Sequence, residues 1–228
     1  MPIRDWPEAI RPRERLLREG PPALSDAQLV ALVVGSGTRT HSALAVAERA
    51  IRELGGVAGF AHADAGRLRA AGLGTATAAR IQAAVELGRR ALAAEQDGAL
   101  LDTPAAAALA LAPHVAHLER EAVVVALLTR KQRLIGVMPV YQGNVSGTSV
   151  RIGELFTEAI RRNAAGIVLA HNHPSGDPEP SPDDARTTRD AVAAGQLLGV
   201  AVVDHLVIAR GRWVSLRERG IAFPASPR

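Results

Sequence analysis

The chain has 228 residues, of which 47% are hydrophobic and 22% charged, and it contains no cysteine. This composition is typical of a globular protein with one large or two small domains. The missing cysteine excludes disulfides, thiolate nucleophiles, iron–sulfur clusters and every zinc site that uses cysteine. The net charge of +4 is shared evenly, at +2 for residues 1–101 and +2 for residues 102–228, so composition does not require a nucleic-acid partner.

The first half of the chain is predicted to be helical. Ser25 is a candidate N-cap for the first helix, and Gly35 ends it. Residues 93–103 are interpreted as a linker, which predicts a helical domain over 1–98 and a second domain over 102–224. The helices of the first domain are expected over 26–33, 41–54, 63–71 and 75–94, from their apolar spacing.

The second half alternates short β-branched runs with amphipathic runs. The strands are expected over 121–129, 134–141, 166–170, 200–209 and 212–216, and the helices over 104–112, 153–163 and 182–198. Some connections are short enough to be hairpins, so the strand directions are mixed. The fold class is therefore α/β, preceded by an all-helical domain.

The strongest chemical signal lies between residues 171 and 184. His171 and His173 are two apart at the end of a predicted strand, so their side chains project to the same side. Ser181 is a candidate helix N-cap, and Asp184 lies in the first turn of that helix. Two histidines and one carboxylate leave a fourth position for water, as in catalytic zinc sites. The alternative is solvated loop histidines, a simple helix cap and an acid that favours the helix dipole; the concentration of these residues in one segment favours the metal.

The spacing His171-x-His173-x7-Ser181-x2-Asp184 matches the JAMM zinc metalloprotease motif at every position, and residues 170–178 resemble the RadC family, also designated UPF0758. The segments that begin at Leu24, Gly72 and Val203 suit this family too, so the resemblance covers most of the chain. It implies an α+β mixed sheet with flanking helices, the MPN/JAB-like fold, which is similar to the cytidine-deaminase-like fold.

The resemblance also implies roles for single residues. His171, His173 and Asp184 would bind Zn²⁺, and Ser181 would contact the developing oxyanion or the bound water. An upstream carboxylate would act as the general base, and Glu121, before the first strand, is at the matching position. Glu154 is the alternative base. His205 is interpreted as structural, with a place in the cleft as the alternative.

The segment around Gly72 and Gly74 resembles a helix-hairpin-helix motif. The glycines permit a tight turn, and free N–H groups at the start of the next helix can bind a phosphate. Arg80 is a candidate for a further phosphate contact that does not read sequence. A compact turn with no ligand is the alternative, and any DNA binding is expected to be weak and non-specific.

Three functions follow from these observations. The first is a zinc-dependent metallopeptidase or isopeptidase that acts on an unidentified peptide or protein. The second is a non-catalytic, DNA-associated repair or recombination accessory factor, and the third is a metal-dependent nuclease. A nuclease of the two-metal kind needs more carboxylates than this segment offers. With no leader or membrane-spanning pattern in the sequence, we expect a cytoplasmic protein without membrane contact.

Overall fold

The computed structural model describes residues 6–142 and 150–223. The outer ends of both predicted domains, residues 1–5 and 224, lie outside the described residues. The chain divides into two compact units between Arg89 and Arg90, whereas the sequence predicted a boundary after residue 98.

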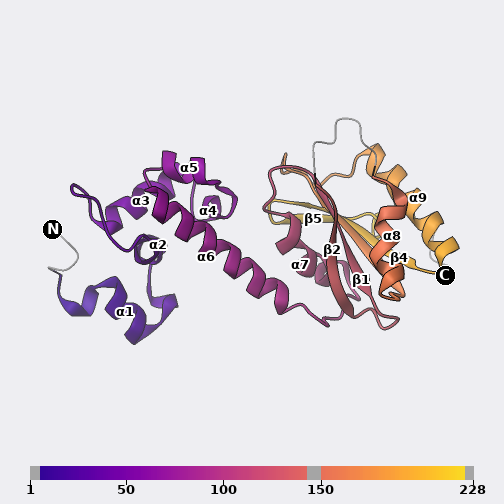
Figure 1. Ribbon diagram of the computed structural model, residues 1–228, viewed down its shortest axis with the longest axis horizontal. Helices are drawn as coiled ribbons and strands as arrows, with labels where there is room; N and C mark the ends of the chain where they lie inside the picture. The colour runs from indigo at the N-terminus through magenta and orange to yellow at the C-terminus, as the bar shows by residue number, and fades with distance from the viewer. Residues whose placement is uncertain (1–5, 143–149, 224–228) are drawn as a thin grey trace. The chain divides into compact units, whose positions relative to one another are not determined.

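The first unit consists of helices (Figure 1). All four predicted helices are present, and α2 begins at a capping box in which Ser25 and Gln28 exchange backbone–side-chain hydrogen bonds of 3.3 and 3.1 Å. The helices are α1 (Pro12–Glu19), α2 (Asp26–Val34), α3 (Ala43–Glu53), α4 (Ala58–His62), α5 (Ala65–Ala70) and α6 (Thr75–Ala94), with 3-10 turns at Glu8–Ile10 and Pro21–Ala23.

The helices α1 and α4 were not predicted. The α1 sequence is dominated by arginine and glutamate, so it lacks a clear apolar stripe. The α4 helix has only five residues, which is too short for a helical period to be visible. Packing against the other helices decides both, since α4 buries Phe60 in the apolar cluster of this unit.

The second unit is a five-stranded sheet in the order β2-β1-β3-β4-β5. Only the β3–β4 pair is parallel, and the other neighbours are antiparallel, which confirms the predicted mixed sheet. The strands are β1 (Ala122–Leu128), β2 (Leu134–Gln142), β3 (Gly166–Asn172), β4 (Ala201–Ala209) and β5 (Arg212–Ser215), and the helices are α7 (Pro104–Val115), α8 (Ile152–Arg161) and α9 (Pro182–Leu198).

Helices cover both faces of this sheet, with α7 on one face and α8 and α9 on the other (Figure 1). The central strand β3 is buried along its whole length. Its residues Ile167 and Leu169 pack in the α8–α9 core, whereas Val168 and Ala170 pack in the α7 core. Because side chains alternate along a strand, the next odd-numbered side chain, His171, is directed to the α9 side.

The last part of the predicted linker belongs to the second unit. Leu101 donates its N–H to the carbonyl of Gln132 (2.8 Å), and Leu134 donates to the carbonyl of Ala99 (2.8 Å). Residues 99–101 are therefore held against the β1–β2 hairpin. Within the described ranges, no helix is both long and apolar enough to cross a membrane.

Candidate metal centre

Three of the predicted residues lie where β3 ends and β1 begins, at the same end of these two inner strands. Antiparallel pairing places Val123 opposite His171. Glu121 lies two residues before Val123 and His173 two residues after His171, just beyond this last pair of the ladder. Because side chains alternate along a strand, we expect both to be directed to the face that carries His171.

Helix α9 supplies the third candidate ligand through its N-terminal cap. Ser181 donates both its N–H and its hydroxyl to Asp184 Oδ2, each at 2.7 Å. The N–H of Asp184 donates back to Ser181 Oγ at 3.2 Å, which completes a capping box. Pro182 at the first helical position favours a helix start at this residue. The cap therefore fixes the Asp184 carboxylate.

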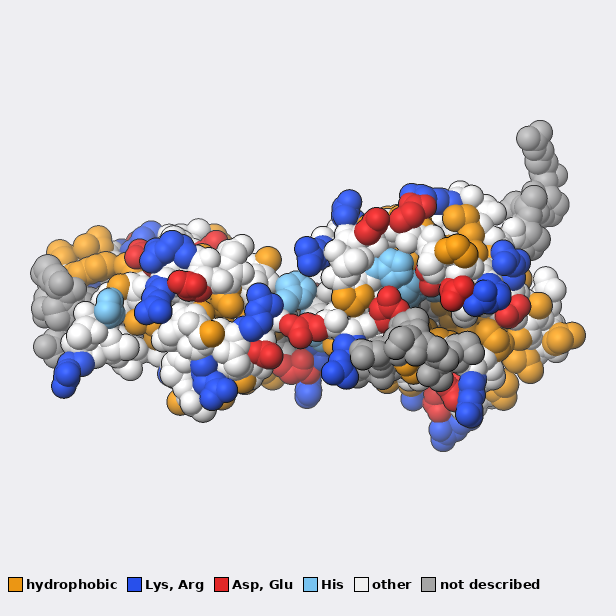
Figure 2. Space-filling model, turned by 90° about the horizontal axis from the view of Figure 1, so that it is seen from above, with side chains coloured by type: hydrophobic (Ala, Val, Ile, Leu, Met, Phe, Trp, Pro, Cys, Tyr) orange, Lys and Arg blue, Asp and Glu red, His pale blue; other side chains and the backbone are white. Residues whose placement is uncertain are grey.

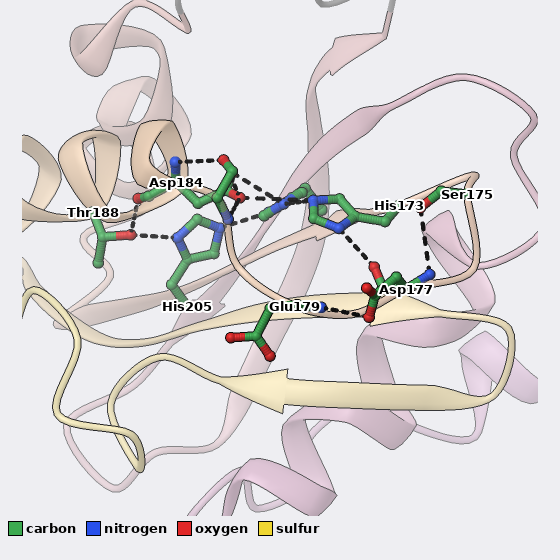
Figure 3. Close-up of polar contacts among 9 residues, drawn as sticks. His173, Ser175, Asp177, Glu179, Asp184, Thr188 and His205 are labelled. Carbon is green, nitrogen blue, oxygen red and sulfur yellow. Dashed lines mark hydrogen bonds and ion pairs between the residues drawn. The ribbon is translucent and has the colours of Figure 1, made fainter.

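Three donor atoms converge between these elements (Figure 3). The Nε2 atoms of His171 and His173 are 3.0 Å apart. Asp184 Oδ1 lies 3.2 Å from His171 Nε2, and its Oδ2 lies 3.6 Å from His173 Nε2. Ligand atoms of a tetrahedral zinc ion are about 3.3 Å apart, given bonds of roughly 2.0–2.1 Å. The spacing fits such an ion, and this group could hold a metal.

The other ring nitrogen of each histidine has a hydrogen-bond partner. His173 Nδ1 lies 2.8 Å from the carbonyl oxygen of Asp177. A carbonyl can only accept, so this nitrogen carries a hydrogen, and in the neutral ring Nε2 has the lone pair that a metal needs. His171 Nδ1 lies 2.9 Å from His205 Nε2. Partners of this kind fix the orientation of histidines that bind metals.

The loop after β3 is itself held in place, so the Asp177 carbonyl is fixed. Gly176 has a φ of +89°, which favours glycine, and its N–H donates to the His173 carbonyl at 3.0 Å. The Arg212 guanidinium of β5 donates to the Gly176 carbonyl at 2.6 Å. A Cβ at Gly176 would lie 2.8 Å from Arg210 Cδ, so a side chain there would have to displace the Arg210 side chain.

The charges of the centre depend on one another. Burial by itself would raise the pKa of Asp184, but hydrogen bonds with His171 and His173 outweigh it and hold this pKa well below its usual range. The hydrogen bond with Asp184 raises the pKa of His173, although burial opposes it. The hydrogen bond with the Asp177 carbonyl and, least of all, the negative charge of Glu121 raise the pKa of His173 further.

Asn172, between the two histidines, is directed to the opposite face and was not singled out from the sequence. Its Oδ1 accepts from the N–H of Ala122 (2.8 Å), and its Nδ2 donates to the carbonyls of Leu118 (2.9 Å) and Arg120 (3.1 Å). These three backbone groups flank Glu121. Asn172 therefore holds the segment that carries the candidate base, and its position in the His-x-His motif was the available signal.

Replacing Asn172 by Asp should lower the free energy of unfolding by about 2–4 kcal/mol, because two donors are replaced by a carboxylate that faces two carbonyls. Urea denaturation of the metal-free protein measures this. Asn163→Asp, at an exposed position with positive φ, is the matched control and should change little. If both variants lowered the free energy of unfolding equally, the proposal that Asn172 stabilises the segment around Glu121 would be contradicted.

Two further buried residues lie beside the centre, and only one of them, His205, was considered from the sequence. His205 on β4 is 3% exposed, and its Nδ1 lies 2.6 Å from Thr188 Oγ1 of α9. Burial, together with the charge of His171, lowers the pKa of His205 to about 3. No sequence pattern pointed to Thr188. For His205, a structural role was predicted with a place in the cleft as the alternative, and neither included a contact with a candidate ligand.

The remaining predicted residues lie elsewhere. Glu154 is in the first turn of α8, half exposed, with an oxygen 3.9 Å from Arg151. Gly72, with a φ of +91°, forms the turn between α5 and α6, and Gly74 precedes α6. Arg80 donates to the carbonyl of Val34, where α2 ends, at 2.9 Å. The predicted contact of these three residues with nucleic acid stays a prediction.

Basic side chains do not gather into one patch on the face of the first unit that Figure 2 shows. On the face drawn in Figure 2 they are dispersed among acidic, apolar and other side chains. On the same view of the second unit, histidine side chains reach the surface with acidic side chains around them. A surface that binds phosphate would need basic side chains, rather than acidic ones, around these histidines.

Comparison with known proteins covers nearly the whole chain. Residues 101–221 match the RadC-like JAB domain, and residues 3–79 match the UPF0758 N-terminal family. A UPF0758 protein of Chloroflexus aurantiacus is 44% identical over 223 residues, 97% of each chain. The UPF0758 proteins of Roseiflexus castenholzii, 43% identical over 97% of this chain and 96% of its own, and of Moorella thermoacetica, 42% identical over 96% of each, are similar. The chain therefore belongs to the UPF0758 family, whose second domain is a RadC-like JAB domain.

Proposed function

We propose that the second unit is a zinc-dependent hydrolase that cleaves a peptide or isopeptide bond. The observation that carries the proposal is the near-tetrahedral spacing of His171 Nε2, His173 Nε2 and the Asp184 carboxylate. Glu121 directly precedes β1, two residues before the residue paired with His171, and its negative charge contributes to the raised pKa of His173. A site for structural zinc alone would have four protein ligands and no need of a neighbouring carboxylate.

The donor set supports zinc as the metal. Imidazole nitrogens with one carboxylate suit zinc, and the lack of cysteine removes the softer alternatives. A zinc ion bound here would supply an activated water and polarise the substrate carbonyl. The ligands would come from the C-terminal end of β3 and from the first turn of α9.

The remaining chemistry belongs to the chain itself. Glu121 accepts a proton from the attacking water and donates it to the departing amine nitrogen, as a general base and then a general acid. The predicted contact of Ser181 with the oxyanion requires its hydroxyl to leave Asp184 Oδ2, which it contacts at 2.7 Å. Until then, Ser181 orients a ligand.

A peptide library with no chosen sequence tests the proposal. The zinc-loaded protein is incubated with proteome-derived peptides, and with peptides carrying lysine isopeptide branches, in water enriched in oxygen-18. Mass spectrometry then detects new carboxyl termini that carry the heavy oxygen. Cleavage that a strong chelator abolishes and added zinc restores is expected. Cleavage that resists the chelator would refute the metal mechanism.

Zinc affinity should rise with pH in the range above about 6.5, the ordinary pKa of histidine. The raised pKa of His173 means that zinc must displace a proton there, so the affinity gains at most about tenfold per pH unit until His173 is neutral. The His173–Asp184 ion pair stabilises the metal-free fold below this range, and that stabilisation is lost as pH rises through the raised pKa.

Competition with a chromophoric chelator between pH 6 and pH 9 measures this affinity, and urea denaturation without metal measures the stability. Asp184 stays ionised throughout, since its pKa is lowered. A zinc affinity that is constant over this range, after correction for the chelator, would contradict the assignment of His173 as a ligand.

A further inference from the structure

A continuous chain of buried hydrogen bonds connects two of the candidate ligands behind the metal centre (Figure 3). Thr188 Oγ1 donates to the backbone carbonyl of Asp184 at 2.6 Å and lies 2.6 Å from His205 Nδ1. His205 Nε2 lies 2.9 Å from His171 Nδ1. Thr188 is fully buried, and His205 and His171 are 3% and 5% exposed, so water cannot readily replace any of these partners.

The hydrogen positions along this chain follow from the kinds of atoms present. The Asp184 carbonyl can only accept, so it takes the single hydroxyl hydrogen of Thr188. Thr188 Oγ1 must then accept from His205 Nδ1–H. A buried His205 is neutral and carries one hydrogen, so its Nε2 accepts. The remaining contact is therefore a hydrogen bond from His171 Nδ1–H to His205 Nε2.

We propose that Thr188 and His205 are positioning residues that keep the His171 hydrogen on Nδ1 and so leave the Nε2 lone pair available to the metal. The inference rests on the metal site of the proposed function and adds two residues that do not touch the metal. It also links the ligands, because the chain starts at the backbone of Asp184 and ends at the ring of His171.

This control is needed because the centre itself favours the wrong tautomer. Asp184 Oδ1 lies 3.2 Å from His171 Nε2 and would accept a hydrogen from it. Without the Thr188–His205 pair, a neutral His171 in the metal-free protein would place its hydrogen on Nε2. The hydrogen would then have to move from Nε2 to Nδ1, or be lost, before His171 could bind a metal.

Two substitutions of Thr188 separate this role from packing. Thr188→Val keeps the volume and removes the hydroxyl, whereas Thr188→Ser keeps the hydroxyl. Thr187→Val, on the same helix, is the matched control for the loss of a threonine. Nitrogen-15 NMR of the histidine rings in the metal-free protein reads the His171 tautomer, in a pH series that is raised until the ring signals stop changing. Chelator competition reads the zinc affinity.

The wild type, Thr188→Ser and Thr187→Val should show the hydrogen on His171 Nδ1, and Thr188→Val should shift it toward Nε2. Zinc affinity should fall about 10- to 100-fold in Thr188→Val alone, the range found for partners of metal-bound histidines. If Thr188→Val fails to fold, two substitutions of His205 give the same test. His205→Gln keeps a hydrogen-bond acceptor for His171, whereas His205→Leu removes it.

An unchanged tautomer and unchanged affinity in Thr188→Val, or in His205→Leu when that pair is used, would overturn the inference. A lower melting temperature without a tautomer shift would also overturn it, since that result would mean that Thr188 acts through packing alone. A wild type that binds no zinc would overturn the proposed function instead, and the tautomer would still be readable in that protein. The two failures are therefore distinguishable.

Discussion

His171→Ala is expected to weaken zinc binding by about two orders of magnitude, since structural zinc sites gain roughly 10–16 kcal/mol from four ligands and this variant removes one. The purified wild type should carry about one zinc per chain, and the variant should lose it on dialysis. Metal analysis by inductively coupled plasma mass spectrometry and chelator competition measure both effects. Peptide cleavage should be lost together with the metal.

His62→Ala is the matched control, because His62 is an exposed histidine at the end of α4 in the first unit. It should retain the full zinc content. Equal zinc loss in the two variants, or a wild type that is metal-free after zinc loading, would contradict the assignment of this centre.

Glu121→Gln is expected to lower the rate of cleavage by about 10²–10⁴-fold, the usual contribution of a general acid–base group. Zinc content should remain near that of the wild type, because Glu121 is not among the candidate ligands. The amide is close in size to the carboxylate, so the fold is retained and the change isolates proton transfer. Cleavage rates on the peptides found with the wild type give the measurement.

Glu154→Gln is the paired comparison, and its activity should be close to that of the wild type. A large loss in Glu154→Gln with little loss in Glu121→Gln would move the role of base to the N-terminus of α8. Full function of Glu121→Gln in cells would favour the other reading of this family, a non-catalytic factor with zinc as a structural element. The two variants therefore decide between an enzyme and a scaffold.

The sequence predicted most of the second unit because each of its elements has a strong local signal. Helix α9, for example, begins at the predicted cap and ends at the predicted residue, since Ser181 and Gly199 mark its two ends. Strand β3 continues two residues beyond its predicted end, through His171 and Asn172. Polar residues seldom indicate a buried strand, and here pairing with β1 and β4 extends it.

The grouping of His171, His173 and Asp184 was predictable because these residues are close in sequence and follow the periods of a strand and a helix. The residues that support it were not, because their contacts join distant segments. Asn172 reaches back to Ala122, and His205 comes from a strand 34 residues after His171. Whether a buried polar residue contacts a ligand depends on strand order, which a single sequence does not contain.

The alternation of side chains at the end of β3 lets one short segment support both metal binding and the position of the proposed base. His171 is directed to the candidate metal centre, and the next residue, Asn172, contacts the backbone on both sides of Glu121. Asp184 comes from a different element, α9, and is joined to His171 through Thr188 and His205. A shift in the end of β3 would therefore disturb the candidate ligands and the candidate base together, which makes this strand end the part of the fold with the least tolerance for substitution.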